Sequence, residues 1–434
     1  MDIDEDAKVL VRFTTTHAEY RVPTTAFSIP VKLTKYGLSE VINHLLAKEP
    51  SEPFDFLVKG RLLRTSLKKL LAQDQTISTE EIIVIEYIPA VSISDETKST
   101  ELPSWIGSIQ NITGQGICAV GCYDGQLRFI DSSTLETLTS VSSHNEPIRA
   151  VATSKFVNMV ATASKDQSIK CWNFSVGKGK QKKSSTIASD LAKTLMGHAT
   201  SVESLTFMDS STASKEVLLS GDWGGNIFGW DFAGSDDGVE VRKKSRHNSG
   251  ASTTQQELRP AFTIKAHVQS ISSICPAGSG TGNIISSSWD HSMKQWDVER
   301  QDCVATFTSS KVVTSMHYHP ETRLLASSHP DGRVRVWDSR LGPEESNVGS
   351  FTNKVGSKQW VSQVQWNVQS TNTFASCDYD GTVRMWDLRS FVPVDTKEVH
   401  QGKVLCLEWA QGGSAILSGG SDCRLSRSDM VGNV

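Results

Sequence analysis

Histidine, aspartate and hydroxyl-bearing residues recur together along most of the chain, and this combination could perform nucleophilic catalysis. In such a triad a carboxylate orients an imidazole, which takes the proton from a serine or threonine hydroxyl. The candidate residues are His144, Asp166 and Trp172; His198 and Trp230; His267, Asp290 and Trp296; Asp331 and Trp337; Asp380 and Trp386; and His400 and Asp422. A catalyst needs one such site, whereas these groups repeat at regular intervals. We therefore interpret them as structural hydrogen-bond networks in which the indole N–H is a further donor.

The interval between the motifs indicates which elements position these side chains. Neighbouring tryptophan positions lie 42 residues apart between 130 and 172, 41 between 296 and 337, and 42 between 386 and 428. This period fits the roughly 40 to 45 residues of a four-stranded WD-repeat propeller blade. Seven such units occur, so we predict a mainly β fold, a closed seven-bladed WD-repeat propeller over residues 104–434.

Each unit also has the pattern of strands joined by tight turns. In residues 333–337 valine alternates with arginine, which is typical of a strand with one buried face. Ile130 and Ser428 replace tryptophan in the first and last units, as suits units that close the ring. Three other units depart from the pattern, and we expect weaker internal networks there. Unit 3 has Gly224 at the turn position with Asp222 two residues earlier, and units 5 and 6 have Ser309 and Ser357 at the histidine position.

Two longer intervals locate insertions between the middle units. Trp172 and Trp230 are 58 residues apart, and Trp230 and Trp296 are 66 apart, so we expect loop insertions near 174–193 and 232–260. Their basic, Ser- and Gly-containing composition is typical of segments that do not pack. The basic residues are Lys182 and Lys183 in the first insertion and Arg242, Lys243 and Lys244 in the second. Such clusters act as nuclear-import signals, contact RNA phosphates, or are simply solvated.

The composition limits the class of protein. A chain of 434 residues exceeds the roughly 250 to 300 residues of a single core, so at least two domains are expected. A net charge of −4 argues against nucleic-acid binding through bulk electrostatics and favours protein partners. The eight cysteines form no C-x-x-C pair, and no metal-ligand cluster or phosphate loop is present, so we expect neither a cofactor nor an enzyme. No apolar run reaches the ~20 residues of a membrane helix.

The first ninety residues lack the repeat and predict a separate domain at 7–90, joined to the propeller by a linker at 91–103. The expected elements are a strand over 9–13, a second strand near 20–22, a helix over 38–46, a strand over 54–58 and a strand over 81–88. The helix shows apolar residues at i, i+3, i+4, i+7 and i+8. The last segment is rich in β-branched residues, as expected of a central strand. This order predicts an α+β ubiquitin-like (β-grasp) domain.

Two strings in this domain make the resemblance more specific. Residues 35–46 read KYGLSEVINHLL and residues 53–67 read PFDFLVKGRLLRTSL. Followed by seven WD repeats with basic insertions, they are similar to the family of WD repeat-containing protein 12, and the resemblance spans essentially the whole chain. It implies a non-catalytic ribosome-biogenesis factor required for large (60S) subunit maturation and pre-rRNA processing. It also implies location in the nucleus, nucleolus and nucleoplasm.

The resemblance further implies partners and one site residue. It implies a scaffold that binds the block-of-proliferation protein, propeller to propeller, together with Pescadillo on the pre-60S particle. The ubiquitin-like domain would dock on the midasin AAA ATPase, which releases the factor from the particle. An acidic residue before the last strand, here Glu80, would complete a Mg²⁺ site on midasin in trans, since hard cations take carboxylate oxygens. The neighbouring Glu81 remains an alternative.

Two other motifs suggest different functions. Trp337-Asp-Ser-Arg340 and Trp386-Asp-Leu-Arg389 match the Trp-Asp-x-Arg pattern of WD-repeat substrate receptors of cullin ubiquitin ligases, although this arginine often closes a blade end. His317 and His319 project from one strand face, but further ligands for a metal are lacking, and ordinary packing is the favoured interpretation.

Overall fold

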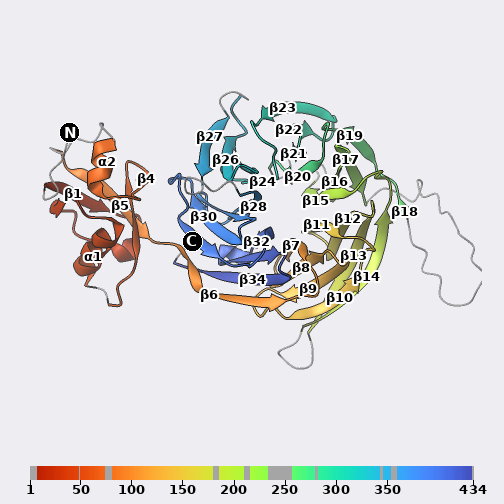
Figure 1. The fold of residues 1–434 in the computed structure, drawn as a ribbon, viewed down its shortest axis with the longest axis horizontal. Coiled ribbons are helices and arrows are strands. Elements are labelled where there is room, and N and C mark those ends of the chain that lie inside the picture. The colour runs from red at the N-terminus through yellow and green to blue at the C-terminus, as the bar shows by residue number, and fades with distance from the viewer. Residues whose placement is uncertain are drawn as a thin grey trace, which may run out of the picture. The chain divides into compact units, whose positions relative to one another are not determined.

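The computed structural model describes residues 7–47, 49–73, 81–178, 185–209, 216–232, 257–278, 282–342, 346–352 and 359–432, and Figure 1 shows their fold. Contacts divide the chain into two compact units. The first comprises Met1–Ser92, Asp387–Val394 and Met430–Val434, and the second comprises Ile93–Trp386 and Asp395–Asp429. Each unit is described by itself.

The N-terminal domain is a mixed sheet packed against a helix. Its elements are β1 (Lys8–Thr14), the 3₁₀ turn η1 (Ala18–Tyr20), β2 (Phe27–Pro30), α1 (Lys35–Leu46), β3 (Phe54–Val58), β4 (Arg61–Leu62), α2 (Leu67–Gln73) and β5 (Ile83–Pro89). The sheet order is β2-β1-β5-β3-β4, with β5 parallel to β1 and antiparallel to β3. The predicted α+β domain with a central last strand is confirmed.

The second strand of this domain lies later than predicted. The segment near 20–22 forms η1 and a loop, and β2 begins at Phe27. The physical reason is a buried side chain: the Tyr87 hydroxyl donates to the carbonyl of Tyr20 and accepts the amide N–H of Val22. These backbone groups are therefore bonded without a neighbouring strand.

Seven sheets make up the second unit, and we number them as blades 1 to 7. Blade 1 contains β7 (Ile106–Ile112), β8 (Ile117–Cys122), β9 (Gln126–Asp131) and β10 (Thr137–Ser142). Blade 2 contains β11 (Ile148–Thr153), β12 (Met159–Ser164), β13 (Ile169–Lys178), β14 (Ser185–Leu195) and β18 (Glu257–Leu258). Blade 3 contains β15 (Val202–Asp209), β16 (Glu216–Asp222), β17 (Asn226–Asp231) and β19 (Phe262–Lys265). Blade 4 contains β20 (Ile271–Pro276), β21 (Asn283–Ser288), β22 (Ser292–Asp297) and β23 (Asp302–Thr308).

The remaining three blades complete the ring. Blade 5 contains β24 (Ser315–Tyr318), β25 (Leu324–Ser328), β26 (Arg333–Asp338) and β27 (Asn347–Thr352). Blade 6 contains β28 (Val361–Trp366), β29 (Thr373–Asp378), β30 (Thr382–Asp387) and β31 (Asp395–Glu398). Blade 7 contains β32 (Val404–Trp409), β33 (Ala415–Gly420), β34 (Arg424–Val431) and β6 (Ser92–Glu101), with a 3₁₀ turn at Gln411–Gly413.

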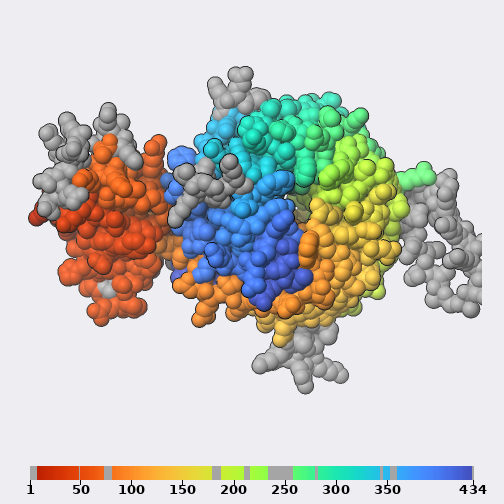
Figure 2. Space-filling view, in the orientation of Figure 1, coloured from red at the N-terminus to blue at the C-terminus, as the bar shows by residue number. Residues whose placement is uncertain are grey.

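The first-listed strand of each blade is the innermost one. These seven strands contact one another in order, and β32 of blade 7 contacts β7 of blade 1, which closes the ring. The space-filling view shows neighbouring blades in continuous contact (Figure 2). The predicted seven-bladed propeller is confirmed.

Ring closure corrects the predicted linker at 91–103. Most of this segment is β6, which pairs with β34 as the outer strand of blade 7, so the first and last parts of the propeller share one sheet. Within β6 only Ile93 is buried, and the fully exposed positions are Asp95, Glu96, Lys98, Ser99 and Glu101. An exposed edge strand needs few apolar residues, which explains why its composition resembles that of a linker.

The first insertion is also more ordered than predicted. Residues 174–178 and 185–193 extend β13 and β14 into a long antiparallel hairpin, whose Phe174 and Ile187 are buried in the core shared by blades 1 and 2. Phe174 packs on Phe129 of blade 1 at a ring-centroid distance of 5.7 Å. Of the second insertion only Phe232 and residues 257–260 are described, and β18 pairs in parallel with β14.

Candidate functional site

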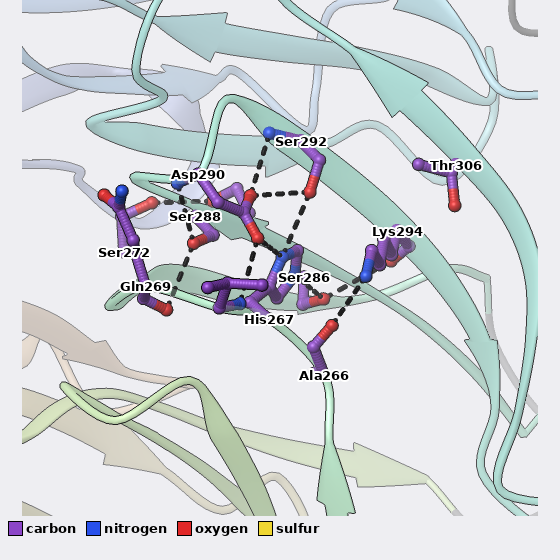
Figure 3. A network of polar contacts seen from close by, with 12 residues as sticks. Ala266, His267, Gln269, Ser272, Ser286, Ser288, Asp290, Ser292, Lys294 and Thr306 are labelled. Carbon is purple, nitrogen blue, oxygen red and sulfur yellow. Dashed lines mark hydrogen bonds and ion pairs between the residues drawn. The ribbon is translucent and has the colours of Figure 1, made fainter.

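Blade 4 shows how the recurring histidine, serine, aspartate and tryptophan are connected, and Figure 3 shows its His267, Ser286 and Asp290. The Trp296 indole donates to Ser286 Oγ at 2.9 Å, and Ser286 Oγ lies 2.8 Å from His267 Nε2. On the other side of the ring, Nδ1 lies 2.9 Å from Asp290 Oδ2. The chain of bonds links strands β21 and β22 to the turn before β20, and thereby holds the blade at one end.

The same chain recurs in blades 2 and 7. In blade 2, His144 lies 2.9 Å from both Asp166 Oδ2 and Thr162 Oγ1, and the Trp172 indole donates to Ser143 Oγ at 3.1 Å. In blade 7, His400 Nδ1 lies 3.0 Å from Asp422 Oδ1, and its Nε2 lies 2.8 Å from Ser418 Oγ. Here Ser428 occupies the tryptophan position, so no indole takes part.

Blade 3 corrects the prediction of a weaker network there. Asp222, the last residue of β16, lies 3.1 Å from His198 Nδ1, and Ser220 bridges His198 Nε2 at 2.7 Å and the Trp230 indole at 2.8 Å. The other carboxylate oxygen of Asp222 accepts the backbone N–H of Asn226 at 2.8 Å. An aspartate two residues early in the sequence therefore reaches the same place in the blade.

Arginine replaces histidine in the other three blades, a feature that the sequence interpretation missed. In blades 1 and 5, two guanidinium nitrogens bind the carboxylate four residues earlier. In blade 6, one nitrogen binds that carboxylate and another nitrogen binds a second carboxylate. The pairs are Arg128 with Asp124 in blade 1, Arg335 with Asp331 in blade 5, and Arg384 with Asp380 and Asp378 in blade 6. The signal was present, because an arginine four residues after the turn aspartate occurs in the blades that lack the histidine. Blades 1, 5 and 6 therefore bond their turn aspartate through arginine instead of histidine.

The tryptophans of blades 5 and 6 keep their usual bonds. The Trp337 indole donates to Ser327 Oγ at 2.7 Å, and that of Trp386 donates to Ser376 Oγ at 2.9 Å. In blade 5, His329 lies 2.9 Å from Ser327 Oγ and 2.9 Å from the carbonyl oxygen of Val312. His329, from a different loop, therefore makes the bond to serine that a histidine at position 309 would have made. Ser357, at the corresponding position of blade 6, lies outside the described residues.

The protonation states of these networks follow from burial and hydrogen bonding. Burial lowers the pKa of His267 and His400, although the facing carboxylates oppose the shift. Burial alone would raise the pKa of Asp290, but the Ser292 hydroxyl and the His267 imidazole together hold it below its usual value. These blades therefore combine neutral imidazole with ionised carboxylate at neutral pH. Ser286 has no exposed surface, so its hydroxyl is closed to substrate and serves the fold.

A central channel passes between the innermost strands, with a cavity of about 820 Å³. Its wall carries the buried carboxylate of Glu408 in β32, which accepts hydrogen bonds from Gln110 Nε2 at 3.0 Å, Asn111 N at 3.3 Å and Gln365 Nε2 at 2.6 Å. All three donors are neutral, and burial raises the pKa of Glu408 to about 7. This carboxyl connects blades 6, 7 and 1 where the ring closes.

The two imidazoles of β24 and its following turn have structural contacts. His317 Nδ1 accepts the backbone N–H of Trp366 at 3.2 Å, and His319 packs edge-on against the Trp366 ring at 5.6 Å. Burial lowers the pKa of His317 to about 4. Across the described ranges, no group of three or more potential His, Cys, Asp or Glu ligands is placed to hold a metal ion.

Both arginines of the Trp-Asp-x-Arg motifs bind the aspartate of their own motif. Arg340 donates to Asp338 at 2.9 and 2.6 Å, and Arg389 donates to Asp387 at 2.9 and 2.7 Å. This geometry matches the interpretation in which the arginine closes a blade end.

The predicted docking and basic residues fall in other parts of the chain. Glu80 lies outside the described residues, and Glu81 is exposed two residues before the start of β5. The basic residues at 182, 183 and 242–244 also lie outside the described ranges. No helix within those ranges is long and apolar enough to cross a membrane.

Comparison with known proteins extends these observations to the whole chain. The family model of the NLE (NUC135) domain matches residues 9–71. That of the WD domain, G-beta repeat, matches 135–173, 258–297, 301–338, 347–387 and 391–426. The chain is 32% identical to a ribosome biogenesis protein WDR12 homolog of Chlamydomonas reinhardtii, over 97% of each chain. It is 32% identical to the homolog of Oryza sativa subsp. japonica, over 97% of this chain and 96% of the relative. The homolog of Nematostella vectensis is 28% identical, over 96% and 98%.

Proposed function

The chain belongs to the WDR12 homolog family of ribosome biogenesis proteins, and we propose that it is a non-catalytic assembly factor for the large (60S) subunit that acts in pre-rRNA processing. One observation carries the proposal: the 32% identity extends over 97% of the chain and includes both the NLE domain and the propeller. The combination of the two domains is therefore a property shared with ribosome biogenesis proteins.

In this proposal the propeller is a scaffold for protein partners. It binds the block-of-proliferation protein, propeller to propeller, and Pescadillo, and it brings both to the pre-60S particle in the nucleolus and nucleoplasm. The closed ring supports this role, because β6 joins the sheet of β34 and ties the beginning of the propeller to its end. The hydroxyls within the blade networks are buried and used in hydrogen bonds, which supports a structural function for them.

The N-terminal domain is proposed to dock on the midasin AAA ATPase. The carboxylate of Glu80 would complete a Mg²⁺ site held by midasin, and ATP hydrolysis would then release the factor from the particle. A carboxylate in the segment before β5 suits this role, since Mg²⁺ takes oxygen ligands and leaves positions open to a partner. Glu81, the alternative residue, is exposed.

Docking is tested with the full-length protein and the adhesion domain of midasin in the presence of Mg²⁺. We expect Glu80→Ala to abolish binding and Glu81→Ala, the matched neighbour, to retain it. Chelation of the metal should act like Glu80→Ala on the unmodified protein. Loss of binding in Glu81→Ala alone would reject the assignment.

The basic insertions are proposed to direct the protein to the nucleus or to contact pre-ribosomal RNA. Replacement of Lys243 and Lys244 by alanine should lower nuclear accumulation, and unchanged localisation would remove the import role.

Affinity purification tests the whole proposal. Pescadillo, the block-of-proliferation protein and pre-60S components should copurify, whereas a cullin adaptor in their place would favour a ubiquitin-ligase receptor.

A further inference from the structure

A row of four aromatic rings from blades 3, 4 and 6 lies at one end of the channel. The ring centroids of Trp223 and Trp289 are 5.5 Å apart, those of Trp289 and Trp360 are 6.4 Å apart, and those of Trp360 and Tyr379 are 5.9 Å apart. All four side chains line the channel cavity. Trp223 is 50% exposed and Trp360 is 39% exposed. The two exposed tryptophans both pack on Trp289, which is only partly exposed. Aromatic residues of this kind dominate the energetics of protein interfaces.

Strand direction places the row at a single mouth of the channel. Trp223, Trp289 and Tyr379 directly follow β16, β21 and β29, which are the second strands of blades 3, 4 and 6. Trp360 directly precedes β28, the first strand of blade 6. Because first and second strands are antiparallel, the start of one and the end of the other lie at the same end of the blade.

The charges at this mouth limit what the row can bind. Arg149 lies over the Tyr123 ring at 5.7 Å, and Lys403 lies over the Tyr379 ring at 4.7 Å, so the protein's own cations already occupy tyrosine faces. A cationic guest would have to compete with these two cations for the tyrosine faces and with Arg149 for Glu203, which binds Arg149 Nε at 2.8 Å. The carboxylates of Asp290 and Asp422, in turns at the same end, face buried imidazoles whose pKa is lowered, and so they keep their negative charge. These carboxylates would repel the phosphates of a nucleic-acid backbone.

The indole N–H groups indicate what kind of group the row lacks. The blade tryptophans, such as Trp230 and Trp296, donate to serine hydroxyls. Among the described residues, no acceptor is bonded to the indole of Trp223, Trp289 or Trp360, and these nitrogens are not among the buried unpaired atoms. The row therefore offers flat apolar faces together with free N–H donors.

We propose that this aromatic row is the docking site for an extended, proline-rich and uncharged segment of a protein partner. Proline rings pack on aromatic faces, and the carbonyls of a polyproline II helix have no internal bonds, so they can accept from the indoles. Such a helix is ordered before it binds, which lowers the entropic cost of association. The inference rests on the proposed scaffolding role of the propeller and names the partner chemistry for one of its faces.

The test measures, by calorimetry, the binding of a synthetic, end-blocked ten-residue proline peptide to the purified full-length protein. We expect saturable binding that Trp289→Phe and Trp360→Phe each weaken roughly fivefold, the effect of one lost hydrogen bond of about 1 kcal/mol, while the ring is kept. Trp105→Phe is the matched control. Trp105 is 48% exposed and packs on Tyr123 at 5.6 Å, but it does not line the cavity, so affinity should change less than twofold.

Several outcomes would overturn the inference. They are absence of saturable binding by the proline peptide, equal weakening by Trp105→Phe, and preferential binding of a ten-lysine peptide or an oligouridine at the row. Far-ultraviolet circular dichroism of each variant checks the fold. If the proline peptide does not bind while Pescadillo and pre-60S components still copurify, the docking inference fails and the proposed function stands. If the peptide binds but the particle does not copurify, the proposed function fails instead.

Discussion

The seven blades are closed in two chemically different ways at the same place. Blades 2, 3, 4 and 7 use a buried histidine between a carboxylate and a hydroxyl, whereas blades 1, 5 and 6 use an arginine that binds the turn aspartate. The imidazole is neutral at pH 7 where its pKa is lowered, and the guanidinium is always charged. The fold therefore requires that the turn be bonded to its blade, but it does not specify which residue forms the bond.

The comparison predicts its largest effect in blade 6, where one arginine serves two carboxylates. Arg384 is buried and binds Asp378, which has no exposed surface, as well as Asp380. Arg384→Met leaves a buried carboxylate without its cation, and removal of one partner from a buried pair costs about 3–5 kcal/mol. Urea unfolding followed by tryptophan fluorescence measures this loss in the propeller, because all eleven tryptophans lie between 105 and 409.

A matched pair in blade 5 serves as the control for this variant. Arg340 also uses two guanidinium nitrogens, both on the carboxylate of Asp338, but its side chain is 57% exposed. Arg340→Met should lower the free energy of unfolding far less than Arg384→Met, because exposed ion pairs contribute little to stability. Equal losses in the two variants would show that burial does not separate them and would contradict the interpretation of blade 6.

Stability against pH provides the next largest effect, because two buried groups titrate with opposite sign. Burial lowers the pKa of His329 to about 4, so the stability it contributes is complete above its unfolded pKa near 6.5 and is lost as the pH falls toward 4. Burial raises the pKa of Glu408 to about 7 from 4.5, so its contribution is complete below pH 4.5 and is lost as the pH rises through 7. Between pH 5 and 6.5 the two contributions offset each other.

Removal of one group should reveal the other. In Glu408→Gln we expect the free energy of unfolding to fall by on the order of 2 kcal/mol between pH 6.5 and 5, relative to its change in the unmodified protein. His329→Gln should change the pH dependence in the opposite sense, again relative to the unmodified protein, because His317, whose pKa burial also lowers, is present in both proteins. Parallel pH profiles for the unmodified protein and Glu408→Gln would show that the carboxyl does not titrate in this range.

The regular parts of the fold could be predicted from the sequence, and the closures could not. Seven tryptophan-motif units at a period near 42 require seven similar blades, since each strand pattern needs a neighbour to cover its apolar face. β6 was missed because Ile93 is its only buried residue, and an edge strand bonded to β34 needs no further apolar pattern. The β13–β14 hairpin was missed because two buried residues, Phe174 and Ile187, decide its packing within a polar composition.

The functional residues divide in a similar way. The spacing of histidine and aspartate indicated a network in each histidine blade, but Asp222 shows that loop geometry can bring a residue to its place from another position in the sequence. The aromatic row was not predicted, because Trp223, Trp289 and Trp360 come from three turns and meet only when the ring has closed. Glu80 remains a prediction, since it depends on a partner surface.

The smallest predicted effect concerns the position four residues after the turn aspartate. It holds arginine in blades 1, 5 and 6, whereas blade 4 has Lys294, whose Nζ donates to the carbonyl of Ala266 at 2.8 Å and leaves Asp290 to the histidine. Arg335→Lys therefore gives blade 5 the lysine without a histidine bonded to the turn aspartate, because the imidazole of His329 bonds Ser327 and the carbonyl of Val312. The ammonium cannot form the two bonds to Asp331, and we expect a loss of about 1 kcal/mol in urea unfolding.

The reverse exchange tests whether the two closures are alternatives. In Lys294→Arg the guanidinium would find Asp290 already bonded to His267 and Ser292, so no second closure can form. We expect unfolding free energy to remain unchanged or to fall slightly, while the double variant His267→Ser with Lys294→Arg should recover part of the loss caused by His267→Ser alone. If Lys294→Arg stabilises the protein by itself, the two networks add to one another, and the division into histidine and arginine blades has another cause.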